Sequence, residues 1–183
     1  MSVKKICLVL VMLALLVSLV GCSKKSGGKE IVIGASLLTQ QDDFYITLAQ
    51  GLKDAAAKSQ DPKIKVLIRN ADFKLTRQLG DIDDFMQQGI DLLILSPTSP
   101  SAICPTLEEV DGQHIPIISV DIKTTSPLVK THIMSDDLGA GKVCGQFVAD
   151  QLKGKGSVAI VTHPIYSSGI NRAIGFREVL QGY

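Results

Sequence analysis

The sequence contains no tryptophan, and only 4% of its 183 residues are aromatic. Lysine and arginine number 19 against 18 aspartates and glutamates, so the formal net charge of +1 indicates no basic surface for nucleic acid. The three histidines and four cysteines stand at none of the spacings typical of zinc sites, and no glycine-rich stretch matches a nucleotide-binding pattern. We therefore expect no metal, no cofactor and no nucleic-acid partner.

The first residues have the three parts of an export signal. A basic pair at 4–5 precedes an apolar run over 6–20, which ends in Leu19-Val20-Gly21-Cys22. The run is shorter than the ~20 residues that cross a bilayer comfortably. Its last four residues resemble the lipobox of bacterial lipoproteins. We predict a lipoprotein signal peptide over residues 1–21.

The lipobox resemblance implies that the thiol of Cys22 takes a diacylglycerol before cleavage, so that Cys22 becomes the lipidated first residue. Two or more acyl chains hold a protein stably to a membrane. Small polar residues follow and predict a flexible tether over 22–29. We expect the chain in the cell envelope, anchored on the extracytoplasmic side through the lipid on Cys22. Cys104 and Cys144 then remain, and we predict two buried free thiols.

Short apolar runs alternate with amphipathic segments after the tether. The expected helices fall near 43–59, 75–89, 101–110, 138–152 and 169–180. The expected strands fall at 30–36, 63–68, 92–95, 116–120, 131–134 and 157–162. Strands separated by helices of this length indicate βαβ units, so we predict an α/β fold with a doubly wound parallel sheet.

The sequence shows no clear set of catalytic residues. Tyr166-Ser167-Ser168-Gly169 lacks the first glycine of a nucleophile elbow, and His163 has no evident partner. Adjacent carboxylates at Asp83-Asp84 and Asp136-Asp137 are interpreted as helix caps and solvated charge. We predict that the protein is not an enzyme.

One group of residues suits a polyhydroxylated neutral ligand. Asp42, Phe44 and Tyr45 follow the first strand, and Asp121 follows the fourth. Ligands of such sheets bind at the carboxyl ends of the strands. Carboxylates accept hydroxyl hydrogen bonds, aromatic rings pack on the apolar face of a sugar, and Arg172 offers a fork of donors. These five residues are the candidate ligand site.

The chain resembles the type I periplasmic binding proteins, in particular the ribose-binding-like branch of sugar receptors for ABC transporters. The resemblance runs from about residue 30 to the last residue. It is carried by these stretches: Asp42-Asp43-Phe44-Tyr45, residues 88–97, residues 115–121, residues 132–137, and Arg172 with Gly175-Phe176.

By this resemblance, two lobes close around a sugar at a hinge. Phe44 and Tyr45 would stack on the sugar, Asp121 would accept its hydroxyls, and Arg172 would donate from the second lobe. The resemblance implies a substrate-binding lipoprotein that delivers a sugar or sugar-like solute to ABC permease subunits. A sensory receptor of the same fold, signalling to a membrane kinase or chemoreceptor, is the alternative.

Three departures from the ribose-binding pattern stand out. Asp42-Asp43 replaces Asn-Pro, and Ile122 replaces an arginine directly after the first-lobe aspartate. Losing a bidentate donor argues against ribose as the ligand. The 183 residues also end inside the second lobe of the family. We therefore predict an N-terminal lobe over 30–135 and an incomplete C-terminal lobe over 136–183, a partial second lobe.

Overall fold

The computed structural model describes residues 29–60 and 62–183. The predicted signal peptide, Cys22 and nearly all of the predicted tether lie outside the described residues. Among those that are described, no helix is long and apolar enough to cross a membrane.

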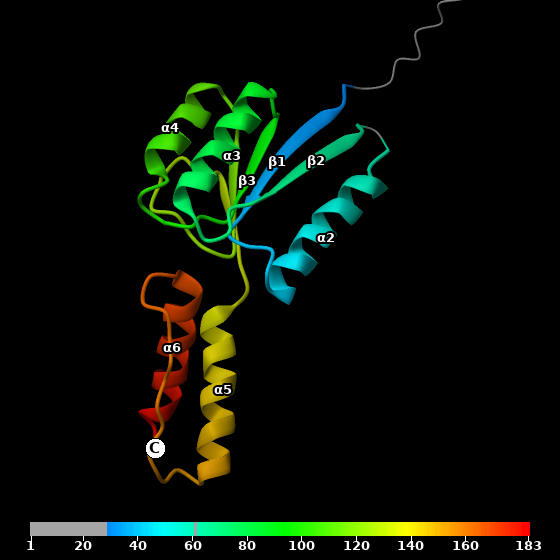
Figure 1. Cartoon of the computed structure of the whole chain (residues 1–183). Helices are drawn as coiled ribbons and strands as arrows, with labels where there is room; N and C mark the ends of the chain where they lie inside the picture. Colours follow the sequence, from blue (N-terminus) through cyan, green and yellow to red (C-terminus); the bar gives the residue numbers. More distant parts are fainter. Residues whose placement is uncertain (1–28, 61) are drawn as a thin grey trace, which may run out of the picture.

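A parallel sheet of five strands forms the centre of the molecule (Figure 1). Its order is β2-β1-β3-β4-β5, and all four strand pairs are parallel. The strands are β1 (Ile31–Leu37), β2 (Ile64–Asn70), β3 (Leu92–Leu95), β4 (Ile117–Val120) and β5 (Thr131–Ile133). The predicted doubly wound α/β sheet is confirmed.

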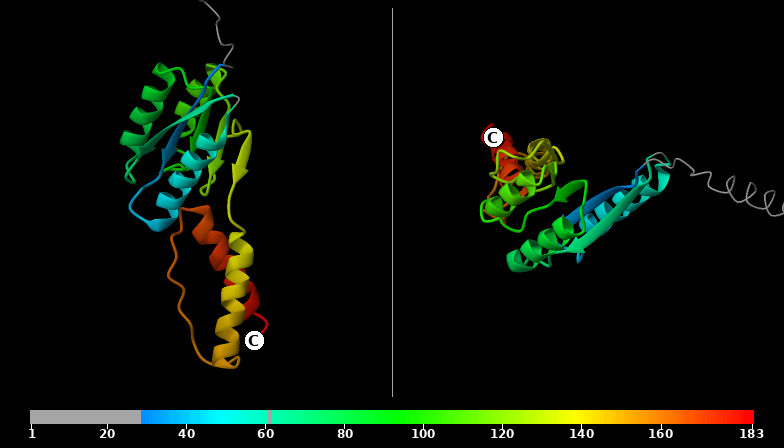
Figure 2. Two further views of the ribbon diagram at one scale, coloured as in Figure 1. Left: turned by 90° about the vertical axis from the view of Figure 1, so that its right-hand side faces the viewer. Right: turned by 90° about the horizontal axis from the view of Figure 1, so that it is seen from above.

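Helices cover both faces of this sheet (Figures 1 and 2). The helix α2 (Asp43–Lys58) packs on one face, and α3 (Leu75–Gln87) and α4 (Cys104–Gly112) pack on the other. Successive side chains of a strand point to opposite faces. Accordingly, Leu93 and Leu95 join the core cluster under α3 and α4, whereas Ile94 joins the cluster under α2.

The helix boundaries follow from local chemistry. The side chain of Asp42 accepts a hydrogen bond from the amide of Tyr45 at 2.9 Å, which caps the start of α2. Gly89 follows α3 with a φ of +69°, a left-handed conformation that glycine adopts at little cost. The predicted end of α3 is therefore confirmed.

The last part of the chain forms a helical hairpin beyond the carboxyl ends of the strands (Figure 2). It consists of α5 (Asp137–Leu152) and α6 (Ser167–Leu180). A side chain at Gly141 would collide with the backbone of Arg172, and one at Gly175 with the backbone of Leu138. These glycines permit close packing of the two helices.

Two expectations for this part are wrong. Residues 157–162 are extended but pair with no other strand of the described chain, and Val161 is fully exposed. A strand needs a neighbour for its backbone hydrogen bonds, and none of the described strands lies beside this segment. Cys144 is exposed instead of buried, while Cys104 is half-buried; both thiols are free, as predicted.

Candidate functional site

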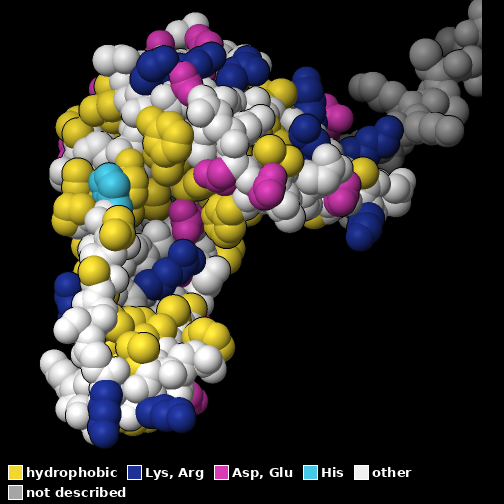
Figure 3. All heavy atoms as spheres, turned by 60° about the horizontal axis from the view of Figure 1, so that its bottom comes forward, with side chains coloured by type: hydrophobic (Ala, Val, Ile, Leu, Met, Phe, Trp, Pro, Cys, Tyr) yellow, Lys and Arg dark blue, Asp and Glu magenta, His cyan; other side chains and the backbone are white. Residues whose placement is uncertain are grey.

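A hollow of about 250 Å³ opens where the sheet faces the helical hairpin. It is lined by side chains of α2, by the end of β4 and by residues 133–135. Figure 3 shows acidic and basic side chains meeting between the two parts of the molecule, with hydrophobic side chains on either side. This is the edge at which the sequence places the candidate ligand site.

Asp121 stands at the centre of the polar part of this hollow. It directly follows β4 and adopts a left-handed φ of 60°, and its amide donates to the carbonyl of Ile133 at 2.9 Å. Its carboxylate oxygen Oδ2 accepts a hydrogen bond from the Tyr45 hydroxyl at 2.6 Å. Burial raises the pKa of Asp121 above its ordinary value, and the negative charges of Asp137 and Asp42 add to the rise. The Tyr45 hydroxyl and the charge of Arg172 oppose it.

The two aromatic residues expected to stack on a sugar differ in their surroundings. Tyr45 is only 4% exposed, and its ring packs in the core under α2. Phe44 is 48% exposed and lines the hollow, with its ring perpendicular to that of Tyr45 at a centroid distance of 5.1 Å. Only Phe44 therefore offers an aromatic face to a ligand. Tyr45 reaches the site through its hydroxyl.

Burial also raises the pKa of the Tyr45 phenol well above its ordinary value, and the hydrogen bond to Asp121 acts in the same direction. The phenol therefore keeps its proton over any physiological pH. A second contact joins its oxygen to the Ser96 hydroxyl at 2.8 Å.

Asp42 has a structural task in the described chain. Its side chain caps α2 and is exposed at the edge of the site. Its charge still acts on Asp121, because it contributes to the raised pKa of that carboxyl group. A direct role for Asp42 in holding a ligand stays a prediction.

Arg172 lies in α6 and is paired with a buried acid. Its Nε and Nη2 both donate to Oδ1 of Asp137 at 2.8 Å. The side chain of Asp137 is 1% exposed, whereas that of Arg172 is 55% exposed. The guanidinium is thus held at one end and open to solvent at the other, where its free nitrogen is available to a ligand.

The sequence interpretation missed Asp137. Its neighbour Asp136 does act as the expected cap, because its carboxylate accepts the amide of Gly139 at 2.9 Å. Asp137, however, points inward to Arg172. Two adjacent residues at a helix start face different directions, and nothing in an Asp-Asp pair indicates which of them is buried.

Gln78 and Ser96 were missed as well. Both are fully buried, and they connect α3 to the carboxyl ends of β1 and β3. One signal was present: Gln78 stands on the apolar face of its helix, between Leu75 and Ile82. A polar residue in a core position needs a specific partner.

The hairpin touches the sheet-bearing part at a few points. The amide of Lys123 donates to the Ser167 hydroxyl at 3.3 Å. Tyr166 packs against the core cluster under α2 and stacks on His163 with a centroid distance of 4.5 Å. These contacts come from the N-terminal end of α6. Arg172, further along this helix, does not line the hollow of about 250 Å³ but a larger one between α5 and α6.

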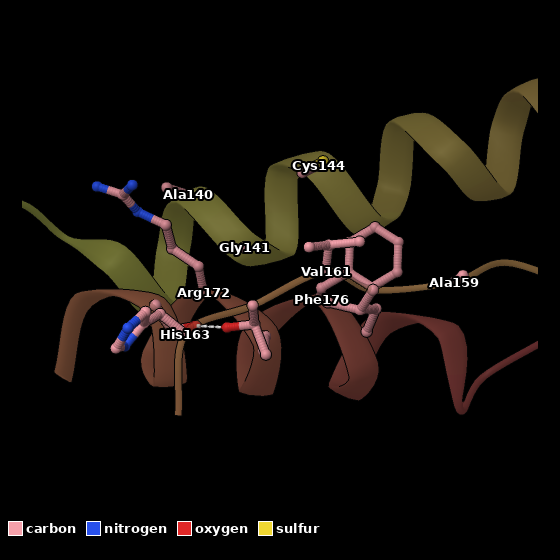
Figure 4. Close-up of a pocket in the computed structure, with 12 residues that line it drawn as sticks. Ala140, Gly141, Cys144, Ala159, Val161, His163, Arg172 and Phe176 are labelled. Atoms are coloured by element: carbon pink, nitrogen blue, oxygen red, sulfur yellow. Dashed lines mark hydrogen bonds between the residues drawn. The ribbon is translucent and has the colours of Figure 1, made fainter. Parts of the chain in front are cut away.

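A second, largely apolar hollow of about 460 Å³ lies between α5, α6 and the extended segment (Figure 4). Cys144, Val161 and Phe176 are among the residues that line it. Thr162 donates to the carbonyl of Gly169 at 3.1 Å on one side, and Arg172 points away from Phe176. Within the described residues, no group of three or more His, Cys, Asp or Glu side chains could hold a metal ion.

The parallel sheet, its two helical layers and the polar hollow at the carboxyl ends of the strands define a lobe of the doubly wound α/β type. Residues 33–183 match the family model described as periplasmic binding protein domain, and the chain belongs to this family.

Among known proteins, the ribose import binding protein of Bacillus subtilis is 30% identical over 86% of this chain and 51% of its own length. The xylitol-binding protein of Mycolicibacterium smegmatis is 29% identical over 76% of this chain and 40% of its own length. The chain thus spans about half the length of these relatives.

Solved structures agree with this assignment. The fructose-binding periplasmic domain of a hybrid two-component system aligns with a TM-score of 0.76 at 27% identity, covering 84% of this chain and 50% of that one. The binding protein of the arabinose ABC transporter from Shewanella aligns with a TM-score of 0.75 at 25% identity, covering 83% of this chain and 51% of that one.

Proposed function

We propose that this protein is the substrate-binding component of an ABC importer and captures a sugar or sugar-like solute in the cleft between its two parts. The observation that carries the proposal is the position of Asp121 at the end of β4 and of Arg172 on α6, where the charge of Arg172 lowers the pKa of Asp121, in a member of the periplasmic binding protein family. The carboxylate accepts hydroxyl protons and the guanidinium donates to ring or hydroxyl oxygens. Relatives named for ribose, xylitol and arabinose support a small polyhydroxylated ligand.

Ribose itself is disfavoured by Ile122. This side chain is 1% exposed and belongs to the core cluster under α2. The place of the family's arginine is thus taken by an apolar core residue, so the first part offers no guanidinium beside Asp121. We expect a ligand that makes its strongest polar contacts as a hydroxyl donor to Asp121 and an acceptor from Arg172.

Calorimetric titration of the full chain with ribose, xylitol, arabinose, fructose and myo-inositol tests this function. Saturable binding of one of them is expected, and Asp121→Ala should weaken it roughly 10–100-fold, because hydrogen bonds to charged groups are worth about 1.5–3 kcal/mol. Asp83→Ala, an exposed carboxylate on α3, is the matched control and should bind like the parent. Equal affinity of Asp121→Ala and parent for the best ligand would place the site elsewhere.

We further propose that Cys22 anchors the protein to the membrane on the extracytoplasmic side. Support comes from Leu19-Val20-Gly21-Cys22 and from a family of periplasmic receptors. Cells that express Cys22→Ala should accumulate an unprocessed precursor without labelled palmitate. Incorporation of label into that variant would contradict the lipid anchor.

A sensory role is the second candidate, because the fructose-binding neighbour belongs to a hybrid two-component system. The two functions separate in a deletion strain supplied with the identified sugar. Loss of uptake supports the importer, whereas normal uptake with loss of a sugar-dependent transcriptional response supports the sensor.

A further inference from the structure

A chain of buried hydrogen bonds leads from α3 to the carboxylate of Asp121. Gln78 donates from Nε2 to the carbonyl of Ser96 at 2.9 Å, and its Oε1 accepts the amide of Thr98 at 2.8 Å. The hydroxyl of Ser96 meets that of Tyr45 at 2.8 Å, and Tyr45 reaches Oδ2 of Asp121 at 2.6 Å. Gln78 and Ser96 are fully buried.

The direction of these bonds follows from the number of protons. A carboxylate only accepts, so the single phenolic proton of Tyr45 goes to Asp121. The Ser96 hydroxyl must then donate its own proton to the Tyr45 oxygen. Gln78 holds the backbone directly after this serine, because its side-chain amide donates to the carbonyl of Ser96 and accepts from the backbone amide of Thr98. The Tyr45 hydroxyl therefore has one fixed orientation.

Asp121 needs such support, because it stands in a left-handed backbone conformation at the end of its strand. This conformation is uncommon for residues other than glycine, although aspartate tolerates it better than most. Tyr45 is the only side chain of the described residues that donates a hydrogen bond to its carboxylate, and Oδ1 receives none. A short bond from a buried phenol thus fixes one oxygen of the carboxylate, while the other has no donor within the described residues.

We propose that Tyr45 is the positioning residue of the ligand site: its hydroxyl bonds Oδ2 of Asp121 and so fixes the orientation in which this carboxylate meets the ligand. This inference rests on the proposed sugar-binding function. It assigns to Tyr45 a role other than the stacking expected from the sequence, since the phenol acts on the ligand through Asp121.

The variant Tyr45→Phe removes only the hydroxyl and keeps the buried ring. Tyr166→Phe, whose hydroxyl makes no hydrogen bond within the described residues, is the matched control. The first readout is calorimetric affinity for the best-bound sugar and for its epimers. We expect Tyr45→Phe to lose about tenfold in affinity, the lower range for a hydrogen bond to a charged group. We also expect the affinities for the epimers to differ less from one another than they do in the parent.

The second readout needs no ligand. Because the Tyr45 hydrogen bond lowers the pKa of Asp121, its removal should raise that pKa further in a carbon-13 NMR titration of the aspartate carboxyls. A purely structural role of Tyr45 would leave this titration unchanged, since phenylalanine fills the same space. Ser96→Ala, which frees the phenol from its other partner, should move both readouts less than Tyr45→Phe does.

The outcomes separate the two proposals. If the parent binds no sugar, the proposed function fails, and the titration alone still decides whether Tyr45 controls Asp121. If Tyr45→Phe leaves either the affinity of a sugar-binding parent or the Asp121 titration unchanged, the positioning inference is wrong while the function stands.

Discussion

The ion pair between Arg172 and Asp137 predicts an unequal response to mutation of its two members. Asp137 is 1% exposed and Arg172 is 55% exposed. Removing one partner of a fully buried pair costs about 3–5 kcal/mol, because the other charge is left uncompensated. Arg172→Ala leaves a buried carboxylate without its cation, and we expect a loss of about 3 kcal/mol in the free energy of unfolding.

Asp137→Asn should cost much less. The asparagine oxygen can still accept from Arg172, and the half-exposed guanidinium remains hydrated. The amide nitrogen would replace Oδ2, which is buried and has no partner, so a cost of about 1 kcal/mol remains. The double variant Arg172→Ala with Asp137→Asn should recover most of the free energy of unfolding that Arg172→Ala loses, because it no longer contains the buried charge of Asp137.

Urea unfolding followed by circular dichroism measures all three free energies. Arg177→Ala removes an exposed guanidinium from the same helix and should change stability by no more than about 0.5 kcal/mol. If Asp137→Asn destabilises as much as Arg172→Ala, or if the double variant shows no recovery, the argument from unequal burial is refuted.

Three further predictions concern packing, thiols and pH. Gly80→Ala should stabilise α3 by up to about 1 kcal/mol, since the added methyl meets nothing within 4 Å. Gly141→Ala should lower the free energy of unfolding by about 1–3 kcal/mol, because its methyl collides with the backbone of α6. Thermal unfolding of the two variants compares these effects. In the native protein the exposed Cys144 should react with a maleimide before the half-buried Cys104, as mass spectrometry of timed samples will show, and equal rates would contradict the described exposures. The raised pKa of Asp121 means that the folded state holds this proton more tightly than the unfolded state, so ionisation destabilises the fold as pH rises through the carboxyl range. Asp121→Asn should therefore gain stability over the parent at pH 7 but not at pH 3, and a gain independent of pH would contradict this.

Most of the fold could be predicted from periodicity. The short apolar runs of β1, β3 and β4 and the three- and four-residue spacing in α3 are local patterns, and each predicted an element close to the observed one. Residues 157–162 carry a similar apolar pattern but form no strand. A strand exists only with a hydrogen-bonded neighbour, and that condition cannot be seen within the segment itself.

The site was only partly predictable for a related reason. Strand ends identified Asp121, and the start of α2 identified Phe44. The partners that hold Asp121 are remote, however: Tyr45 lies 76 residues away and is joined to Ser96 across 51 residues. Both aromatic positions read alike in the sequence, and only packing distinguishes the buried ring from the exposed one.

The distribution of donors and acceptors in the cleft bears on the ligand more than any single residue does. Ile122 is buried and stands where the resemblance places a guanidinium beside Asp121, so in the proposed site Arg172 is the charged donor. Two of the three guanidinium nitrogens of Arg172 already donate to Asp137, and one carboxylate oxygen of Asp121 already accepts from Tyr45. Asp121 and Arg172 thus each have only part of their hydrogen-bonding capacity left for a ligand. A ligand with its own charge would leave one of them unmatched, whereas a neutral polyol satisfies both, because each hydroxyl donates and accepts.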